Sequence, residues 1–448
     1  MENDKLVVIG GDAGGMTAAS LVRRMHPGRK IVVFERGHHT SYASCGLPYY
    51  IAGMVDDPQS MVARTPEEFR EKYDIDVRMR HEVVSIDTKA QQLQVRHLES
   101  DTIFREPYDQ LLIATGASPV WPGVDGVEAK GIFALSVLQS GIEVFEYMDA
   151  ASPRRAVIVG GGYIGLEMAE ALLERGLEVS LLDMAPQVMG TLDAEMAEIV
   201  SKYMAEQGIS LYLDESLKHF EQRNGRVSAV VTAKRTLGAD LVILGMGIKP
   251  NSALAGQAGI ALGASQAIRV NRQQQTSVPN VWAAGDCATS IHRVSGHEVH
   301  VALGTVANKQ GLVAGKNLAG EQAGFPGVCG TAITRIKALE VARTGLNEKE
   351  LKALDIPFKT ETISATTRSA YFPGTGDITV KLLAHRDDGR LLGGQIVGYN
   401  GAAKRIDTII AAITAGMTAR DLMYLDLSYA PPFSPVWDPV QVAARKLV

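Results

Sequence analysis

The hydrophobic pattern at the start of the chain predicts a strand, a glycine turn, a helix and a second strand. A short, β-branched run, Lys5–Ile9, breaks into glycines between Gly10 and Gly15 and continues into an alanine-rich stretch. A second apolar run, Ile31–Phe34, then ends in Glu35. Short apolar runs bounded by glycine are typical of buried strands, so we expect one strand–turn–helix–strand unit here.

The same pattern returns in the middle of the chain. The apolar run Arg155–Val159 leads into the glycine-rich segment Gly160–Gly165, which matches the spacing G-x-G-x-x-G in full. The next apolar run, 177–182, ends in Asp183. The chain therefore has two similar units, and the required order of strand, glycine turn, helix and acid makes the pair far more specific than one glycine motif.

Both units have the chemistry of a dinucleotide-binding site. Glycines let the backbone approach a pyrophosphate, and the helix N-terminus offers unpaired N–H groups and the positive end of the helix dipole. Glu35 and Asp183 stand where a carboxylate accepts hydrogen bonds from a ribose hydroxyl, about 20 residues after the last glycine. In the first unit Asp12 replaces the middle glycine, and its carboxylate faces the phosphates unless it turns back to cap the helix.

Two further apolar segments end in glycine turns. Leu111–Ala114 is followed by Thr115 and Gly116, and the segment 276–284 is followed by a Gly-Asp pair that ends at Asp286. These two segments resemble the A-T-G and G-D segments of flavoproteins that have two dinucleotide-binding domains. In those proteins the aspartate of the G-D pair hydrogen-bonds the ribityl chain of FAD, and the resemblance implies the same role for Asp286.

Composition narrows the class of protein. The chain has 448 residues, of which 46% are hydrophobic and 21% charged, and a net charge of −5. These values indicate a globular chain of several domains, and they give no indication of a surface that binds nucleic acid or a membrane. No apolar stretch approaches the roughly 18 residues of a membrane helix. The N-terminus lacks signal-peptide character and cysteines are few, so we expect a cytoplasmic protein. The histidines have no ligand spacing, so we expect no metal.

One cysteine lies in a position of chemical interest. Cys45 stands in the segment Ser44–Tyr49, shortly after the first unit, and the other two cysteines, Cys287 and Cys329, are far away in sequence. A local internal disulfide is therefore excluded, and an oxidised Cys45 has to be a sulfenic acid or a mixed disulfide with a small thiol. The alternative is an inert, buried cysteine, which is what we expect of Cys287 and Cys329.

With these motifs in hand, the chain is similar over nearly its full length to the single-cysteine pyridine nucleotide-disulfide oxidoreductases. These include coenzyme A disulfide reductases, NADH oxidases, NADH peroxidases and polysulfide reductases. The segments beginning at Tyr371 and Tyr429 resemble the tyrosine motifs of coenzyme A disulfide reductases. Ala13 stands where oxidases and peroxidases usually have a histidine beside the sulfenic acid. The motifs therefore match the coenzyme A disulfide reductases best.

The resemblance implies an α/β fold with two Rossmann-like dinucleotide-binding domains and a C-terminal α+β dimerisation domain. We expect the FAD-binding domain in two parts, 1–120 and 245–322, with the NAD(P)-binding domain, 121–244, inserted between them. Residues 323–448 have alternating apolar stretches and an apolar helical run but no phosphate motif, and they form the expected dimerisation domain.

The resemblance also implies an activity, the FAD-dependent reduction of coenzyme A disulfide or related small disulfides by NADH through Cys45. A methionine rather than an arginine or lysine follows Asp183, which favours NADH over the alternative, NADPH, because a carboxylate repels a 2′-phosphate. The implied site residues are Cys45 together with Tyr371 and Tyr429 of the partner in a homodimer for catalysis; Gly10, Gly15, Glu35, Arg36, Val83, Thr115, Gly116, Asp286 and Ala302 for FAD; Gly160, Gly162, Tyr163, Gly165, Glu167 and Asp183 for NAD(P)H; and Thr17, Arg24, Ser41 and Ser44 for coenzyme A.

Four of these residues have more specific expected roles or properties. By resemblance, Tyr163 is a gate over the flavin, and Glu167 lies near the nicotinamide. We expect a positive helix-dipole environment to lower the pKa of Cys45. Arg24 is the best candidate for a contact to the phosphates of coenzyme A. Three nearby basic residues are further candidates, or simply solvated surface charges: Arg64, Arg70 and Lys72.

Other activities stay open on the sequence alone. A polysulfide or persulfide reductase would use the same cysteine, although many such relatives append a rhodanese-like domain. An NADH oxidase would cycle through a sulfenate, and Ala13 counts against efficient catalysis by that route. A flavin-bearing redox sensor belongs to another class and would be reduced by NADH without steady-state turnover.

Overall fold

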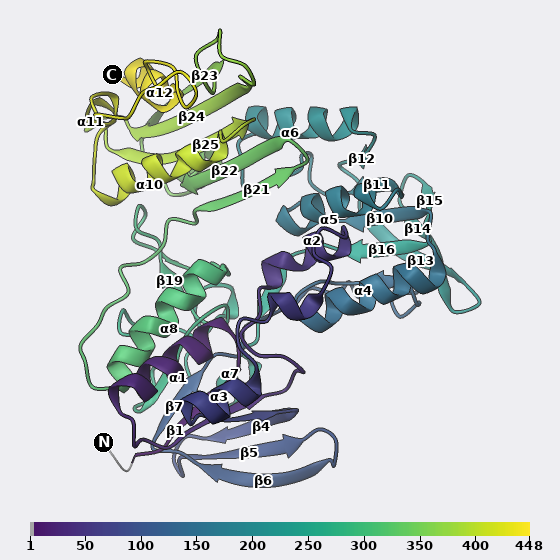
Figure 1. The fold of residues 1–448 in the computed structure, drawn as a ribbon, viewed down its shortest axis with the longest axis vertical. Coiled ribbons are helices and arrows are strands. Elements are labelled where there is room, and N and C mark those ends of the chain that lie inside the picture. Colours follow the sequence, from purple (N-terminus) through teal and green to yellow (C-terminus); the bar gives the residue numbers. More distant parts are fainter. Residues whose placement is uncertain (1–3) are drawn as a thin grey trace.

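The structure, a computed structural model, describes residues 4–448 and arranges them in three lobes (Figure 1). The first lobe is built on a five-stranded parallel sheet. Its strands, in spatial order, are β18 (Val281–Ala283), β7 (Gln110–Ile113), β1 (Leu6–Ile9), β2 (Ile31–Glu35) and β3 (Asp76–Met79). The edge strand β18 follows β7 by more than one hundred and fifty residues, so two distant parts of the chain complete one sheet.

Two different layers cover the faces of this sheet. On one face, α1 (Ala13–Met25) and α8 (Gly304–Leu318) bury the apolar side chains of the strands. On the other face lies a three-stranded antiparallel sheet. Its strands are β4 (His81–Asp87), β5 (Gln92–His97) and β6 (Thr102–Pro107). The short helices α3 (Pro66–Tyr73) and α7 (Ala253–Gln257) complete the lobe.

The second lobe repeats the order of four strands of the first sheet, but its edge strand beside the fourth comes first in sequence rather than last. Its parallel sheet consists of β12 (Ser210–Tyr212), β11 (Glu178–Leu182), β10 (Arg155–Val159), β16 (Leu241–Leu244) and β9 (Ile132–Phe133). In both sheets the strand that precedes the glycine turn is central, with the acid-bearing strand on one side of it. Helices cover one face: α4 (Leu138–Ala151), α5 (Tyr163–Glu174) and α6 (Ala194–Glu206). An antiparallel sheet covers the other: β13 (Leu217–Arg223), β14 (Arg226–Thr232) and β15 (Thr236–Gly238).

The chain enters and leaves the second lobe through two paired strands. The strands β8 (Ala117–Pro119) and β17 (Ile248–Pro250) are antiparallel, with Ser118 opposite Lys249. The side chain of Asn251, directly after β17, donates a hydrogen bond to the carbonyl of Thr115 at 2.8 Å. The two crossings are therefore fastened to each other rather than free. The boundaries proposed for the domains, at 120, 244 and 322, stay a prediction.

The third lobe is an antiparallel sheet with helices. Its strands, in spatial order, are β21 (Ala332–Ile336), β22 (Leu339–Gly345), β25 (Leu391–Gly398), β24 (Asp377–His385) and β23 (Phe358–Thr366). The helices are α9 (Glu348–Ala353), α10 (Ile406–Thr414), α11 (Ala419–Met423) and α12 (Pro439–Leu447). The alternating stretches and the apolar helical run predicted for this segment thus form β24, β25 and α10, and the α/β fold class is confirmed.

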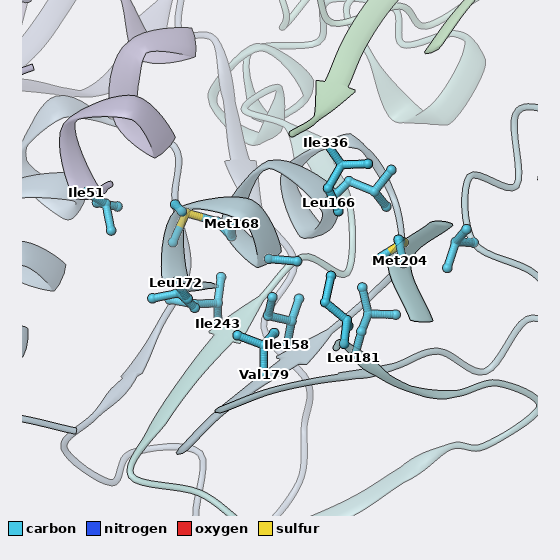
Figure 2. Close-up of a cluster of buried hydrophobic side chains, with 14 of the residues drawn as sticks. Ile51, Ile158, Leu166, Met168, Leu172, Val179, Leu181, Met204, Ile243 and Ile336 are labelled. Carbon is cyan, nitrogen blue, oxygen red and sulfur yellow. The ribbon is translucent and has the colours of Figure 1, made fainter. Parts of the chain in front are cut away.

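The largest apolar core joins segments of all three lobes. Figure 2 shows Leu166 and Met168 of α5 among the apolar side chains of the second sheet, with Ile51 on one side and Ile336 on the other. Ile51 ends the short helix α2 (Leu47–Ile51), which lies in sequence between β2 and β3 of the first lobe, and Ile336 ends β21 of the third lobe. The segment that carries Cys45 is therefore anchored in the core of the second lobe. None of the described helices is both long and apolar enough to cross a membrane.

The close contact between α1 and α8 gives the first prediction. A Cβ atom at Gly311 in α8 would lie 2.4 Å from the carbonyl oxygen of Gly14 in α1, so the two backbones have no room for a side chain. We expect Gly311→Ala to lower the free energy of unfolding by about 1–3 kcal/mol, the usual cost of overpacking. Thermal unfolding measures it, with Gly304→Ala in the same helix as control, because a Cβ there meets no atom within 4 Å. Equal melting temperatures for the two variants would contradict the prediction.

Candidate active site

The two glycine loops have the same backbone geometry. Gly10 has a φ of 110°, and a Cβ there would lie 2.1 Å from the carbonyl oxygen of Ala114, while a Cβ at Gly15 would lie 2.0 Å from the oxygen of Gly10. The corresponding Cβ atoms at Gly160 and Gly165 would lie 2.3 and 2.0 Å from backbone oxygens. These four glycines are therefore required by the turn itself, in addition to any ligand.

The acid that ends the second strand of each unit holds its own glycine loop. Glu35 accepts a hydrogen bond from the amide of Gly11 at 2.7 Å, and Asp183 accepts one from the amide of Gly161 at 2.6 Å. The other oxygen of each carboxylate accepts from an amide two residues further along the chain. Backbone amides thus fix the orientation of both carboxylates toward their loops. The spacing in the sequence predicted the acids but not these hydrogen bonds.

Asp12, in the first loop, does not cap the following helix through its side chain. It is the N-cap residue of α1, but its carboxyl makes no capping hydrogen bond. Burial raises the pKa of Asp12 to about 6; hydrogen bonds from the amides of Tyr42 and Ala13 oppose the rise, and the carboxylates of Glu35 and Asp286 add to it. The capping arrangement that would have turned this carboxylate away from phosphates is absent.

Asp286 presents a buried acceptor that has no donor. Its Oδ1 is buried and hydrogen-bonds to no residue that the structure describes, and burial raises the pKa of the carboxyl. The preceding Gly285 has a φ of 85°, and its amide donates to the side chain of the buried Gln310 at 2.8 Å. A ring nitrogen of His300 lies 2.7 Å from the backbone oxygen of Asp286. An acceptor held in this way fits a hydroxyl of the ribityl chain of FAD.

Other residues expected at the two nucleotides are arranged as follows. The Thr115 hydroxyl donates to the carbonyl of Asn251 at 2.6 Å, and Gly116 has a φ of 66°. A Cβ at Gly162 would meet no atom within 4 Å, which leaves the backbone of this glycine open to an approaching group. The remaining three of the predicted FAD residues have no contact that assigns them a role: exposed Arg36, buried Val83 on β4 and partly buried Ala302. Asn251 and Gln310, which position Thr115 and Asp286, were missed because single Asn and Gln residues carry no motif.

Cys45 is the exposed cysteine of the chain. It lies in the 3₁₀ turn Ser44–Gly46 directly before α2, whereas Cys287 and Cys329 are buried, as expected. The predicted lowering of the Cys45 pKa is wrong for this chain: desolvation by the surrounding polypeptide raises it, although the sulfur opens to solvent on one side. The Glu167 carboxylate adds to the rise, and a hydrogen bond with the Ser44 side chain opposes it. The Asp286 carboxylate adds to the rise as well, and the helix α2 after Cys45 has only five residues.

Glu167 and Tyr163 are both held by residues that the sequence did not single out. Glu167 accepts a hydrogen bond at 2.9 Å from the hydroxyl of Thr334 on β21 of the third lobe. Burial raises the pKa of Glu167, and this hydrogen bond opposes the rise. Tyr163, the first residue of α5, hydrogen-bonds through its side chain to Thr191. The third lobe therefore contributes to the orientation of side chains beside Cys45.

Within one chain, the two predicted catalytic tyrosines are not brought to Cys45. Tyr371 follows β23 and Tyr429 follows α11, and both are exposed. Figure 1 shows the α11–α12 end of the third lobe well apart from α2, the helix that follows Cys45. Large apolar side chains are exposed around this end of the lobe: Tyr424, Phe433, Val436 and Trp437.

Of the four residues predicted for coenzyme A, Ser44 contacts the cysteine, and Arg24 lies at the end of α1 that is far from the first loop. Thr17 on α1 donates a hydrogen bond to Asn308 of α8 at 3.0 Å, and Ser41 has an unusual φ of 47°. Ser44 is at the sulfur of Cys45. Arg24 is exposed in the last turn of α1 and forms no ion pair with any residue that the structure describes.

The three further basic candidates are already engaged. Arg64 lies over the ring of Tyr73 at 4.9 Å, and Arg70 and Lys72 form ion pairs with glutamates of their own helix, α3. These three side chains are therefore already stacked or paired within the first lobe. Arg24 is the basic residue of this group that forms no ion pair with a residue that the structure describes.

Comparison with known proteins agrees with this arrangement. Residues 4–311 match the family described as pyridine nucleotide-disulphide oxidoreductase, and residues 331–439 match the dimerisation domain of that family. The NAD(P)H coenzyme A polysulfide/persulfide reductase of Pyrococcus horikoshii is 41% identical over 99% of this chain and 98% of its own. The coenzyme A disulfide reductase of Staphylococcus haemolyticus is 30% identical over 99% of both chains. The crystal structure of reduced CoADR-RHD of Bacillus anthracis has a TM-score of 0.96 and 37% identity, covering 99% of this chain and 80% of that one.

These matches confirm the predicted family resemblance, the C-terminal dimerisation domain of the fold and the use of FAD and NAD(P)H. The two glycine loops with their acids and the unpartnered oxygen of Asp286 are the features of the molecule that fit these cofactors. The chain belongs to the pyridine nucleotide-disulphide oxidoreductase family and is an NAD(P)H-dependent flavoprotein disulfide oxidoreductase.

Proposed function

We propose that this enzyme reduces coenzyme A disulfide, or another disulfide containing coenzyme A, with NADH, and that Cys45 is its redox-active residue. The observation that carries the proposal is the placement of the cysteines: Cys45 is exposed at the junction of the lobes, while Cys287 and Cys329 are buried and cannot pair with it locally. A single accessible sulfur takes its disulfide partner from the substrate.

The chemistry assigned to Cys45 is thiol–disulfide exchange. Its thiolate attacks one sulfur of the substrate disulfide, a bond forms between Cys45 and that half of the substrate, and the other half leaves as a thiolate. Two electrons and a proton then return Cys45 and the bound coenzyme A to the thiolate and thiol states. FAD supplies the path by which these two electrons pass from the nicotinamide to the disulfide.

The binding of the two nucleotides is assigned to the two loops. FAD would be held at the first loop, with Glu35 for its ribose, Asp286 for its ribityl chain and the turn at Thr115 and Gly116. The nicotinamide nucleotide lies at the second loop, from Gly160 to Gly165, with its ribose at Asp183. Tyr163 gates the flavin, and Glu167 is beside the nicotinamide. In both cases the helix N-terminus faces the pyrophosphate.

Coenzyme A is the proposed substrate group because the chain offers a suitable surface. Arg24 provides a positive charge that forms no ion pair with a residue in the described part of the chain, and Thr17, Ser41 and Ser44 provide polar groups in the first lobe. A guanidinium is well suited to a phosphate because its planar fork makes paired hydrogen bonds. The names of both similar enzymes, from Pyrococcus horikoshii and Staphylococcus haemolyticus, include coenzyme A.

We further propose that the active enzyme is a homodimer in which Tyr371 and Tyr429 reach Cys45 of the partner. Both tyrosines are exposed, among other exposed apolar residues, on the lobe that matches the dimerisation domain of the family, and this supports the arrangement. A phenol beside the cysteine can hydrogen-bond or protonate the departing thiolate of coenzyme A.

A second candidate is the reduction of coenzyme A persulfide or polysulfide. It is favoured by the greater identity, 41%, to an enzyme with that name than to the disulfide reductase, 30%. Both reactions use Cys45 as the attacking sulfur. An oxidase is less favoured because Ala13 offers no side chain for proton transfer, and a redox sensor differs from all of these in showing no turnover.

The first test replaces the sulfur. We expect Cys45→Ser to lower the rate of NADH-dependent reduction of coenzyme A disulfide by roughly a thousandfold or more, because the attacking group is lost. Bleaching of the flavin by NADH in the absence of disulfide stays as in the unchanged protein. Stopped-flow absorbance and steady-state NADH oxidation measure the two steps, with coenzyme A disulfide, polysulfide, peroxide and oxygen compared side by side.

Cys329→Ser is the matched control and retains turnover. Intact-mass measurement of the oxidised protein is expected to find an adduct of the mass of coenzyme A, lost in Cys45→Ser and kept in Cys329→Ser. If NADH bleaches the flavin but none of the four acceptors gives turnover, the protein is a redox sensor and the proposed reductase activity is wrong. If peroxide or oxygen is the best acceptor and no coenzyme A adduct forms, the oxidase replaces the reductase.

The second test concerns the nucleotide. Asp183 is held on the loop with its carboxylate beside the ribose position, and the neighbouring Met184 is exposed. We expect Asp183→Ala combined with Met184→Arg to move the ratio of kcat/KM for NADH over NADPH toward NADPH by about tenfold or more, because an arginine pairs with the 2′-phosphate. Met184→Ala is the control and leaves the ratio near its starting value. An unchanged ratio in the double variant would place the ribose elsewhere.

The third test concerns Asp12. Its folded-state pKa of about 6 lies above the ordinary value of 3.8, so the stability that its protonated form contributes is lost as the pH rises through about 6. We expect Asp12→Asn to raise the melting temperature more at about pH 8 than at about pH 5, with a gain of up to about 3 kcal/mol at the higher pH. Thermal unfolding at both values is the measurement. An equal gain at the two pH values would show that Asp12 does not titrate between them.

A further inference from the structure

We propose that Lys381 in the third lobe is a positioning residue for the NAD(P)H site. A buried cluster of charges around its ammonium group fastens the loop 189–193 against the second glycine loop and Tyr163. The inference rests on the proposed binding of the nicotinamide nucleotide at that loop, and it assigns a role in that binding to a lobe that carries no phosphate motif.

The cluster joins the third lobe to the second. Lys381, on β24, is fully buried, and its Nζ lies 3.0 Å from Asp193, 2.6 Å from Glu348 and within hydrogen-bond distance of Glu195. Asp193 and Glu195 are at the start of α6 in the second lobe, where the positive end of the helix dipole also favours carboxylates. Glu348 is at the start of α9 in the third lobe. One cation therefore compensates three carboxylates across the lobe boundary.

Hydrogen bonds fix Asp193 from the same side. The side-chain amide of Gln395 donates to Oδ2 of Asp193 at 2.7 Å, and the backbone amide of Asp193 donates back to the carbonyl oxygen of the Gln395 side chain at 2.8 Å. The amide of Glu348 donates to the other oxygen of Asp193 at 3.0 Å. Lys381 and Gln395 lie opposite each other on β24 and β25, so a rigid sheet presents both groups to Asp193.

The loop that ends at Asp193 reaches the nucleotide site. The amide of Met189 donates to the carbonyl oxygen of Gly161 in the second glycine loop at 2.7 Å, with a φ of 49° at Met189 that few non-glycine residues adopt. The carbonyl oxygen of Thr191 accepts from Arg343 of β22 at 3.1 Å, and the Thr191 side chain hydrogen-bonds to Tyr163. The loop thus contacts both the glycine loop and the proposed gate.

Removal of the ammonium group should disturb this whole chain of contacts. Of the three carboxylates, only Glu348 would keep a cation from the described part of the chain, Lys352, and the buried Asp193 would be left without a counterion there and without access to water. The start of α6 and the loop 189–193 would move or loosen, and with them the support of Gly161 and Tyr163. Displacements of about 1 Å in a binding site are enough to alter binding and reaction rates severalfold or more.

The experiment compares Lys381→Met with Lys352→Met in the FAD-loaded enzyme. Lys352 pairs with the same Glu348 at 2.8 Å, but it is exposed and its recorded ion pair is within α9, which makes it a matched control. Hydrogen–deuterium exchange of the segment 186–195 is measured without nucleotide. Steady-state kinetics give KM for NADH and kcat at saturating NADH. For Lys381→Met we expect exchange and KM to rise about fivefold or more with kcat changed much less, and for Lys352→Met no change.

Two more variants complete the test. Lys381→Arg keeps the charge and is expected to restore most of the protection from exchange. Thr191→Val removes the hydroxyl at an exposed position without touching the ion cluster, and it is expected to raise KM for NADH. In the double variant with Lys381→Met, Thr191→Val raises KM for NADH by a smaller factor than it does alone, because both changes act through one loop.

The outcomes separate this inference from the proposed function. A folded Lys381→Met with unchanged exchange and unchanged KM for NADH overturns the inference. If that variant does not fold, an unchanged KM in Thr191→Val overturns it. If the unchanged protein is not reduced by NADH, the proposed function fails, and the exchange of the segment 186–195 still decides whether Lys381 holds the loop.

Discussion

The molecule depends on one steric constraint, which occurs twice. In each parallel sheet the central strand runs into a glycine that faces the carbonyl oxygen at the end of the neighbouring strand, at a separation that no Cβ could tolerate. This contact lets the chain turn sharply into the helix, so that the helix N-terminus opens at the carboxyl edge of the sheet. The acid of the next strand is then within hydrogen-bond reach of the loop. Both nucleotide sites follow from this repeated contact.

The segment that carries Cys45 lies where the lobes meet. Cys45 lies in sequence between β2 and β3 of the first sheet, but the helix after it is buried in the core of the second lobe, where Ile51 joins the residues of α5. From the opposite side, β21 of the third lobe brings Thr334 to Glu167. The sulfur is therefore held by parts of the chain that are distant in sequence, and its surroundings depend on contacts between lobes.

The sequence predicted the parts of the fold that have local rules. The central and acid-bearing strands, the glycine turns, the α/β class and the burial of Cys287 and Cys329 follow from hydrophobic runs and from glycine and acid spacing. Contacts across lobes had no such signal. Thr334, Gln310 and Asn251 are ordinary polar residues whose roles arise only when distant strands meet. The pKa of Cys45 was predicted in the wrong direction, because the sequence indicates neither its desolvation by the surrounding polypeptide nor the nearby carboxyl groups of Glu167 and Asp286.

The paired strands β8 and β17 have a consequence for the order in which the protein folds. Between them the chain completes the second lobe, and only later does it provide β18, the edge strand of the first sheet. A ribosome releases the first four strands of that sheet long before the fifth, so β7 is left with an open edge while the inserted lobe is made. Pairing across so large a separation in sequence is slow. The nascent chain thus carries an exposed strand edge during synthesis, a state in which aggregation competes with folding and chaperones are most useful.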